Sequence, residues 1–143
     1  MASATATLNR RGTSEIYIGG AGDTRTRLVA AYAEARQRDF AHEAHHDAHY
    51  FPHYALRRIL NLARQHADAG RTLILVGHSW GGDTALRVLK ALQPRRVDLL
   101  VCVDPVPKSR LNPPPTPRNA RRIIHVDARP SHPNRSDQVK EMG

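Results

Sequence analysis

The sequence predicts an α/β fold: a doubly wound, mostly parallel sheet between two layers of helices, which is a minimal three-layer sandwich. Apolar strand-like runs alternate with amphipathic segments, a pattern that implies right-handed βαβ crossovers. The runs LILV at 73–76 and LLVCV at 99–103 are apolar without alternation, as expected of strands covered on both faces. Residues that could take part in catalysis stand at the carboxyl ends of four of the expected strands: Gly20, Ser79, Asp104 and Asp127. Because the carboxyl ends of parallel strands meet at one edge of a sheet, these positions predict a single site.

The periodicity places one domain at residues 15–127. A small, polar and flexible tail at residues 1–14 precedes it, and an irregular or incomplete segment at residues 128–143 follows it. Strands are expected at residues 15–20, 48–51, 72–76, 97–103 and 122–126. Apolar residues at helical spacing predict helices at 24–38, at 55–69 and from Gly81 to about residue 92, and Asp23 or Thr24 can cap the first. Prolines at residues 109–118 indicate a rigid surface loop or lid.

The composition limits the kinds of partner that the chain is expected to bind. Its 143 residues include 22 Lys and Arg against 13 Asp and Glu, a net charge of +9, which favours anionic partners. These basic residues are scattered and are not interleaved with aromatics, so nucleic-acid binding is not expected. The single cysteine, Cys102, lies in an apolar run and is predicted to be a buried hydrophobe. We found neither a secretory leader nor an apolar run of membrane-spanning length, and we expect a cytoplasmic protein of undetermined oligomeric state.

The motif that indicates chemistry is Gly77-His78-Ser79-Trp80-Gly81, a match to G-x-S-x-G. In this motif a strained strand-to-helix turn exposes a serine at the edge of a sheet, and a strand before and a helix after it are both legible here. The helix that follows directs the positive end of its dipole at the serine oxygen. Ser79 is therefore predicted to be a nucleophile, with an incidental serine in an ordinary turn as the alternative.

The segment GHSWGG after LILV, together with VDLLVCVDPV at residues 97–106, resembles the α/β-hydrolase superfamily, and most closely its small lipase-, esterase- and thioesterase-like members. The resemblance covers Glu15 to about Asp127. It implies a serine hydrolase that acts on a small-molecule ester or thioester, without a cofactor or a metal. From this resemblance we expect no counterparts of the first two strands and the last strand of larger hydrolases in these residues.

The resemblance also implies roles for particular residues. The backbone N–H groups of Trp80 and of the Gly20-Ala21 turn would form the oxyanion hole. The acid that orients the base would be Asp104, because of its Asp-Pro-Val context, or else Asp127.

The base would be a histidine late in the chain. His132 is the only late loop histidine, since His125 falls inside an expected strand. The alternative is a degenerate or C-terminally truncated hydrolase that lacks the histidine and acts as a binding unit.

A remote alternative is a zinc hydrolase. His42, Glu43 and His46 match H-E-x-x-H, which on a helix would direct both histidines to one zinc ion. Pro52 and the lack of an apolar face argue against such a helix, and the match arises easily in a segment this rich in histidine. We expect instead a polar connection that leads into a strand, with incidental surface metal binding and with His53 lining the pocket.

Overall fold

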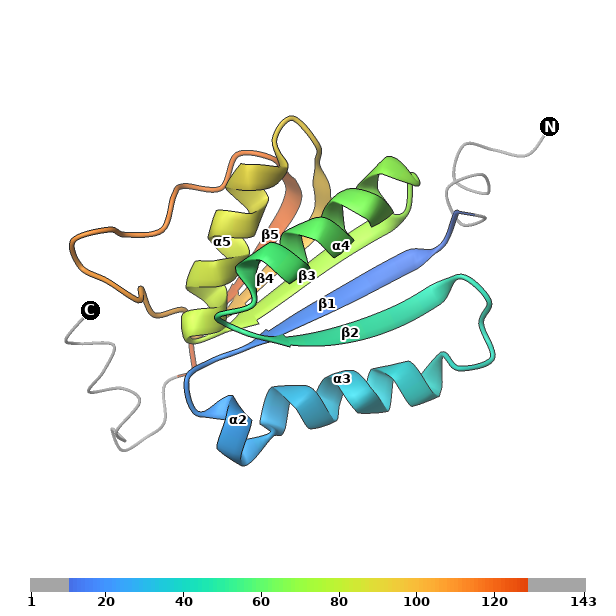
Figure 1. Cartoon of the computed structure of the whole chain (residues 1–143), viewed down its shortest axis with the longest axis horizontal. Helices are drawn as coiled ribbons and strands as arrows, with labels where there is room; N and C mark the ends of the chain where they lie inside the picture. The colour runs from blue at the N-terminus through green and yellow to red at the C-terminus, as the bar shows by residue number, and fades with distance from the viewer. Residues whose placement is uncertain (1–10, 129–143) are drawn as a thin grey trace.

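The computed structural model describes residues 11–128, which form one parallel sheet with helices on both faces (Figure 1). The five strands are β1 (Thr13–Gly19), β2 (His46–Pro52), β3 (Thr72–His78), β4 (Val97–Val103) and β5 (Ala120–Val126), in the sheet order β2-β1-β3-β4-β5. The helices are α2 (Asp23–Thr26), α3 (Leu28–Asp39), α4 (Leu56–Asp68) and α5 (Trp80–Leu92). The predicted α/β class and parallel sheet are confirmed.

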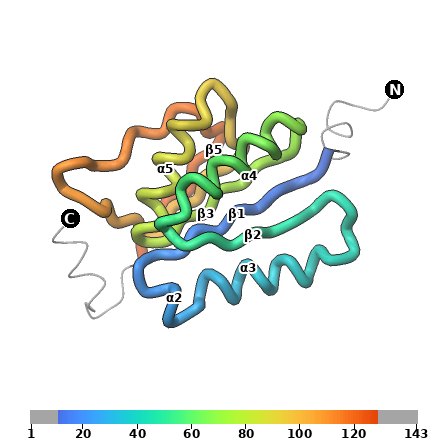
Figure 2. The backbone as a smooth tube through the Cα atoms, viewed as in Figure 1, coloured from blue at the N-terminus to red at the C-terminus, as the bar shows by residue number. Residues whose placement is uncertain are grey.

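The two faces of the sheet are covered by different helices (Figures 1 and 2). Side chains alternate along β1, so Ile16 and Ile18 join the main core with α4 and α5. Tyr17 points to the other face, where it packs with Ala33 of α3 and Ala48 of β2. The main core also buries Cys102, as predicted for that cysteine, and burial raises the pKa of its thiol. These layers leave the two ends of the strands accessible for function.

Several element boundaries differ from the prediction. Strand β1 begins at Thr13, so the last two residues of the predicted tail at 1–14 belong to the sheet, β3 continues to His78, and β5 begins at Ala120. The helix expected at residues 24–38 is divided into α2 and α3 at Arg27, which has a left-handed φ of 54°. The Asp23 carboxylate accepts hydrogen bonds from the N–H groups of Val29 (2.7 Å) and Ala30 (3.3 Å), so Asp23 caps the second helix rather than the first. Strand β2 begins at His46, two residues before the expected start, because its polar first residues pair with β1.

Residues 11–128 contain no helix with the length and apolar character needed to cross a lipid bilayer.

Candidate functional site

The predicted site residues that directly follow strands lie in one row across the carboxyl end of the sheet. The register pairs His78 of β3 with Val103 of β4, and Val103 with Val126 of β5. On the other side, Gly19 of β1 pairs with Pro52 of β2. The residues that follow these strands therefore form what we call the carboxyl-end row: His53, Gly20, Ser79, Asp104 and Asp127. The expectation that strand ends gather these residues is met by the register.

Ser79 occupies the junction between β3 and α5 in a strained conformation. Its φ of 54° and ψ of −122° lie where residues with a Cβ rarely occur, at a cost of about 1–3 kcal/mol. Three backbone hydrogen bonds hold it: Ser79 N–H donates to Val103 O (3.0 Å), and Ser79 O accepts from Gly82 (2.9 Å) and Val106 (3.1 Å). The turn is thus fixed from β4 as well as from its own helix.

Close backbone packing explains the two motif glycines. A Cβ on Gly81 would lie 2.2 Å from the carbonyl oxygen of Ile18 in β1. A Cβ on Gly77 would lie 2.4 Å from the carbonyl oxygen of Gly81. The strand, the turn and the helix can approach this closely only without side chains at both positions, which is the physical content of the G-x-S-x-G spacing.

The turn after β1 lies against the serine. A Cβ on Gly20 would be 2.8 Å from Ser79 Cβ and 3.3 Å from Ser79 Oγ. Trp80 begins α5, so its N–H belongs to the first turn of a helix, where donors have no partner within the helix. The structure therefore brings Gly20 and Trp80 together at Ser79, with Ala21 exposed beside Gly20. Their role as oxyanion donors stays a prediction.

The two candidate acids flank the same edge but differ in environment. Asp104 is half-buried, has a φ of 45°, and donates its N–H to Val126 O (2.8 Å). Its Oδ1 accepts a hydrogen bond from the N–H of Ala128 (2.7 Å), so the chain that leaves β5 is attached to this carboxylate. Asp127 is exposed. Asp104 is therefore the more buried of the two candidate acids.

The predicted base, His132, lies outside the described residues. In three other histidines a ring nitrogen contacts a side chain away from Ser79: His46 contacts Glu15, His49 contacts Asp47 and His66 contacts Ser14.

His53 lies in the carboxyl-end row, as expected of a pocket residue. Its ring meets Trp80 edge-on, with centroids 5.1 Å apart and an interplanar angle of 79°. Burial and the charge of Lys108 lower the pKa of His53. Both effects disfavour the protonated imidazole.

A buried aspartate, which the sequence analysis did not identify, anchors the proline-rich segment beside the site. The Asp83 side chain accepts hydrogen bonds from Arg87 Nε (2.6 Å) and from the N–H of Lys108 (3.1 Å). Arg87 also donates to the carbonyl of Asn112 (2.6 Å), and Lys108 Nζ donates to the carbonyl of His53 (2.8 Å). The only sequence signal was a charged residue directly after Gly81-Gly82, at a position that a helix starting there would bury.

The zinc-hydrolase helix is wrong. Residues 40–45 form turns, and His46 is already the first residue of β2, so His42, Glu43 and His46 do not share a helix face. The segment lacks the apolar side chains that would bury such a helix, and His46 instead pairs with β1. The polar connection into a strand is what the structure contains.

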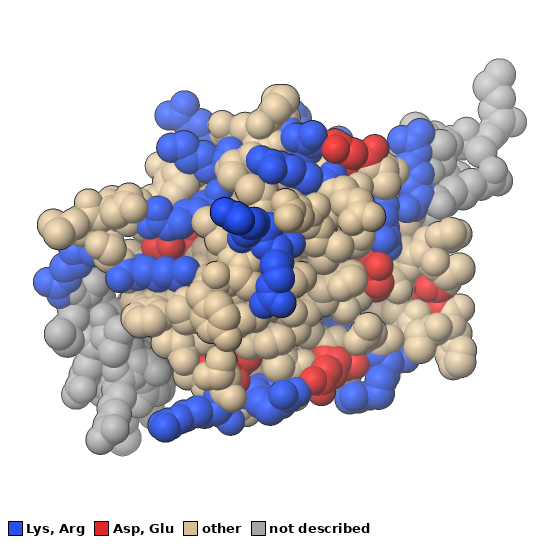
Figure 3. All heavy atoms as spheres, in the orientation of Figure 1, with Lys and Arg blue, Asp and Glu red and all other residues tan. Residues whose placement is uncertain are grey.

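Basic side chains are spread over the molecule rather than concentrated. On the face drawn in Figure 3, Lys and Arg side chains lie over all three long helices, with acidic and uncharged residues between them. On that face, the distribution matches the scattered pattern read from the sequence. It offers no continuous basic track for a phosphate backbone.

A family model described as "alpha/beta hydrolase fold" matches residues 20–129, which is 110 of the 143 residues. The chain belongs to the α/β-hydrolase family. This family membership fits the strand order, the strained serine turn and the row of polar strand ends, and it supports a hydrolase type of function. No significant match was found among curated proteins or among solved structures.

Proposed function

We propose that this α/β-hydrolase cleaves an ester or thioester of a small molecule by acyl transfer through Ser79. The observation that carries the proposal is the left-handed φ of Ser79 at a strand-to-helix junction packed against Gly20. A strained residue held this firmly by its neighbours indicates a functional position, because folding alone has no use for the strain. Ser79 Oγ attacks the acyl carbon, and the alcohol or thiol leaves. Water then hydrolyses the acyl-serine bond, which releases the acid and restores the Ser79 hydroxyl.

The developing negative charge on the substrate oxygen needs donors beside Ser79. The N–H of Trp80, at the start of α5, and the N–H groups of the Gly20-Ala21 turn are the candidates. Gly20 lies against the serine side chain, which supports a donor from this turn. Loss of one such donor typically costs about 3 kcal/mol of transition-state stabilisation.

Activation of Ser79 requires a base, for which we propose His132 with Asp104 as its orienting acid. Ala128 donates its N–H to Asp104 Oδ1 at 2.7 Å, and His132 follows four residues later in the chain. Four residues can span at most about 14 Å, so a chain attached at Asp104 can bring His132 back to that carboxylate. The imidazole then takes the Ser79 proton and returns it to the leaving group.

The test is covalent labelling of the full chain with a fluorophosphonate probe, located by peptide mass spectrometry. We expect one adduct on Ser79 in the wild type and none in Ser79→Ala. Ser109→Ala, which removes an exposed serine from the proline-rich segment, is the matched control and should label like the wild type. A folded wild-type chain that takes up no probe would overturn the proposal and would leave a binding unit on the same fold.

The substrate class is tested separately with acyl p-nitrophenyl esters and acyl thioesters of increasing chain length. Turnover of at least one series, lost in Ser79→Ala by a factor of about 10⁶, is the expected result. If Ser79 is labelled but neither series is turned over, the proposal that Ser79 is a nucleophile would stand and the proposal of ester and thioester substrates would be rejected.

A further inference from the structure

A cluster of potential metal ligands lies at the opposite end of the sheet from Ser79. Asp47 and His49 are two residues apart on β2 and so point to the same face, toward α4, which contributes His66 from its last turn. One ligand atom from each residue lies within 4.8 Å of the others. We call these three residues the Asp47–His49–His66 cluster. His49 pairs with Ile16 of β1, which pairs with Leu75 of β3, four residues before Ser79. The cluster is therefore about 13 Å from the serine position along the strands and two strands away from it.

One distance within the cluster matches a tetrahedral ion, and the three ligand atoms all lie within 4.8 Å of one another. His49 Nε2 lies 3.3 Å from Asp47 Oδ2. Zinc bonds of about 2.0–2.1 Å in a tetrahedron place two ligand atoms about 3.3 Å apart, so this pair already has the required spacing. His49 Nε2 is buried and has no hydrogen bond of acceptable geometry. Its nearest polar partner is the Asp47 carboxylate, as an ion pair, and a cation bound between the two side chains would satisfy both groups.

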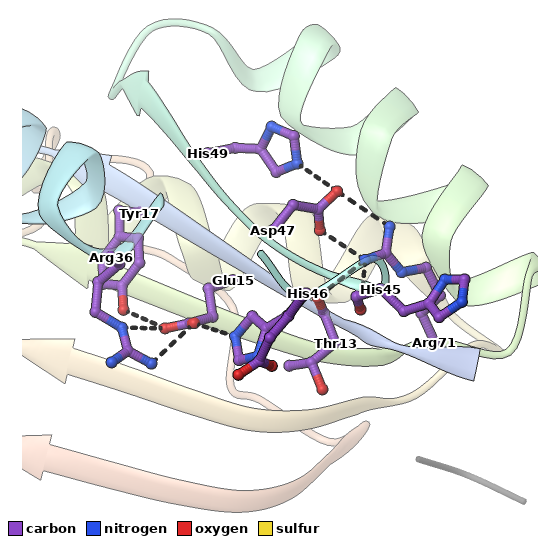
Figure 4. Close-up of polar contacts among 10 residues, drawn as sticks. Thr13, Glu15, Tyr17, Arg36, His45, His46, Asp47, His49 and Arg71 are labelled. Carbon is purple, nitrogen blue, oxygen red and sulfur yellow. Dashed lines mark hydrogen bonds and ion pairs between the residues drawn. The ribbon is translucent and has the colours of Figure 1, made fainter. Parts of the chain in front are cut away.

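The surroundings orient the other two ligands. His66 Nδ1 is 2.6 Å from Ser14 Oγ, a buried contact that leaves the second ring nitrogen available for a metal. Metal-bound histidines commonly use their other nitrogen in this way. Arg71 contacts Asp47 Oδ1 at 2.7 Å and Oδ2 at 3.2 Å, which orients the carboxylate and leaves a lone pair of Oδ2 toward His49 (Figure 4). The Arg71 charge repels a cation and so limits the affinity.

We propose that the Asp47–His49–His66 cluster binds one Zn²⁺ ion with a water molecule as fourth ligand. Two nitrogens and one carboxylate oxygen are ligands that zinc accepts. Side chains of Asp47 and His49 are 37% and 30% exposed, so a water molecule and the ion can enter from solvent. The ion would join β2, which lies at one edge of the described sheet, to α4, and its role would be structural.

This site is tested by measuring zinc binding to the full-length chain after a chelator has removed any bound metal. Isothermal titration with ZnCl₂ should give one ion per chain. Loss of a residue that only orients a metal ligand typically weakens metal binding by 10–100-fold. His49→Ala removes a ligand itself, so it should weaken zinc binding by about 100-fold or more. The matched control is His42→Ala/His45→Ala, which removes two exposed histidines outside the cluster and should leave the affinity near that of the wild type.

X-ray absorption of the zinc-loaded wild type gives a reading that does not depend on any variant's folding. Two imidazoles and oxygen donors should surround the ion. No stoichiometric zinc, equal affinity in wild type and His49→Ala, or loss of binding in the His42/His45 variant would each overturn the proposal. The last result would assign the metal to the exposed histidines of the connection before β2.

Discussion

The two ends of the sheet are built by different means. At the carboxyl end, Ser79 and Asp104 are positioned by backbone hydrogen bonds and by glycines that allow close packing. At the amino end, charged and polar side chains hold the strands through what we call the amino-end network: Glu15, Tyr17, Arg36, His46, Asp47 and Arg71 (Figure 4). The carboxyl end tolerates strain because the backbone around it is closely fixed. The amino end contributes stability through ion pairs, among which Glu15 is the most buried member.

Glu15 is the centre of the amino-end network. Its side chain is 4% exposed and accepts hydrogen bonds from Arg36 Nε (2.9 Å) and Tyr17 OH (2.7 Å), with His46 Nε2 at 2.5 Å. Burial by itself would raise the pKa of Glu15. Hydrogen bonds from Arg36, Tyr17 and His46 outweigh the burial and hold the pKa below its usual value. The carboxylate is therefore charged and satisfied, so changes here should affect stability and leave chemistry at Ser79 intact.

The largest expected effect is at the carboxyl end. Asp104→Asn keeps the size of the side chain but removes the charge that would orient and stabilise the histidine, and a comparable change in a serine triad lowers kcat by about 10⁴-fold. Asp127→Asn is the matched control and should retain most of the activity. Ester turnover and probe labelling measure both, and the free energy of unfolding should change little. A larger loss of activity in Asp127→Asn than in Asp104→Asn would show that Asp127 is the acid.

The counterpart at the amino end is Glu15→Gln. Removal of one partner of a buried ion pair costs about 3–5 kcal/mol, and the lower value applies because Arg36 is 30% exposed. Urea unfolding should show a loss of about 3 kcal/mol with labelling of Ser79 unchanged in the folded variant. Glu34→Gln, which removes an exposed partner of Arg27, should cost less than about 1 kcal/mol. Equal losses in the two variants would show that the Glu15 pair contributes no more than a surface pair.

The same carboxylate predicts a pH dependence. Because the pKa of Glu15 is lower in the folded chain, its contribution is complete above the pKa of an unfolded glutamate, about 4.3, and declines as the pH falls through the lower folded value. The wild type should lose stability below about pH 4 more steeply than Glu15→Gln does. Unfolding free energies at a series of pH values measure this. Parallel curves would contradict a lowered pKa at Glu15.

A smaller effect is expected where the turn after β1 meets Ser79. An alanine Cβ at Gly20 would lie 2.8 Å from Ser79 Cβ and 3.0 Å from the carbonyl oxygen of His78, so the serine or the turn must move. Misplacement by about 1 Å can cost 100-fold, and Gly20→Ala should slow probe labelling by up to that factor. Gly22→Ala, in the same loop with open space around it, is the matched control. Similar labelling rates in both variants would show that the position of the β1 turn does not affect the reaction of Ser79.

The two ends also differ in how well sequence predicted them. Regular backbone patterns revealed the strands, the serine turn and the row of strand ends, because apolar runs and glycine spacing are local. The break at Arg27 was missed because Leu28 and Val29 continue the helical spacing. The start of β2 at His46 was missed because the polar residues His46 and Asp47 show no strand pattern.

The amino-end contacts were invisible for a different reason. Glu15 and Arg36 are 21 residues apart, and Ser14 and His66 are 52 residues apart. No local pattern links such pairs, and only the folded register brings them together. The same holds for Asp83, whose partner Lys108 comes from a loop beyond β4.

Tyr17→Phe removes the smallest part of the amino-end network. Burial and the neighbouring Glu15 charge raise the pKa of Tyr17, so its hydroxyl stays protonated and donates to Glu15 at every working pH. Loss of a hydrogen bond to a charged group should cost about 1.5 kcal/mol, while the ring keeps its edge-on contact with Tyr32. Tyr32→Phe, at an exposed position, is the control and should be near neutral.

Combining Tyr17→Phe with Glu15→Gln then shows whether the network acts as a unit. Because the hydroxyl stabilises the Glu15 carboxylate, the cost of Tyr17→Phe should largely disappear in the Glu15→Gln background. Urea unfolding of the four proteins in this cycle measures the coupling. Additive losses would mean that Tyr17 and Glu15 stabilise the amino end independently. The contrast between a carboxyl end held by backbone contacts and an amino end held by a side-chain network would then rest on the Arg36 and Arg71 ion pairs alone.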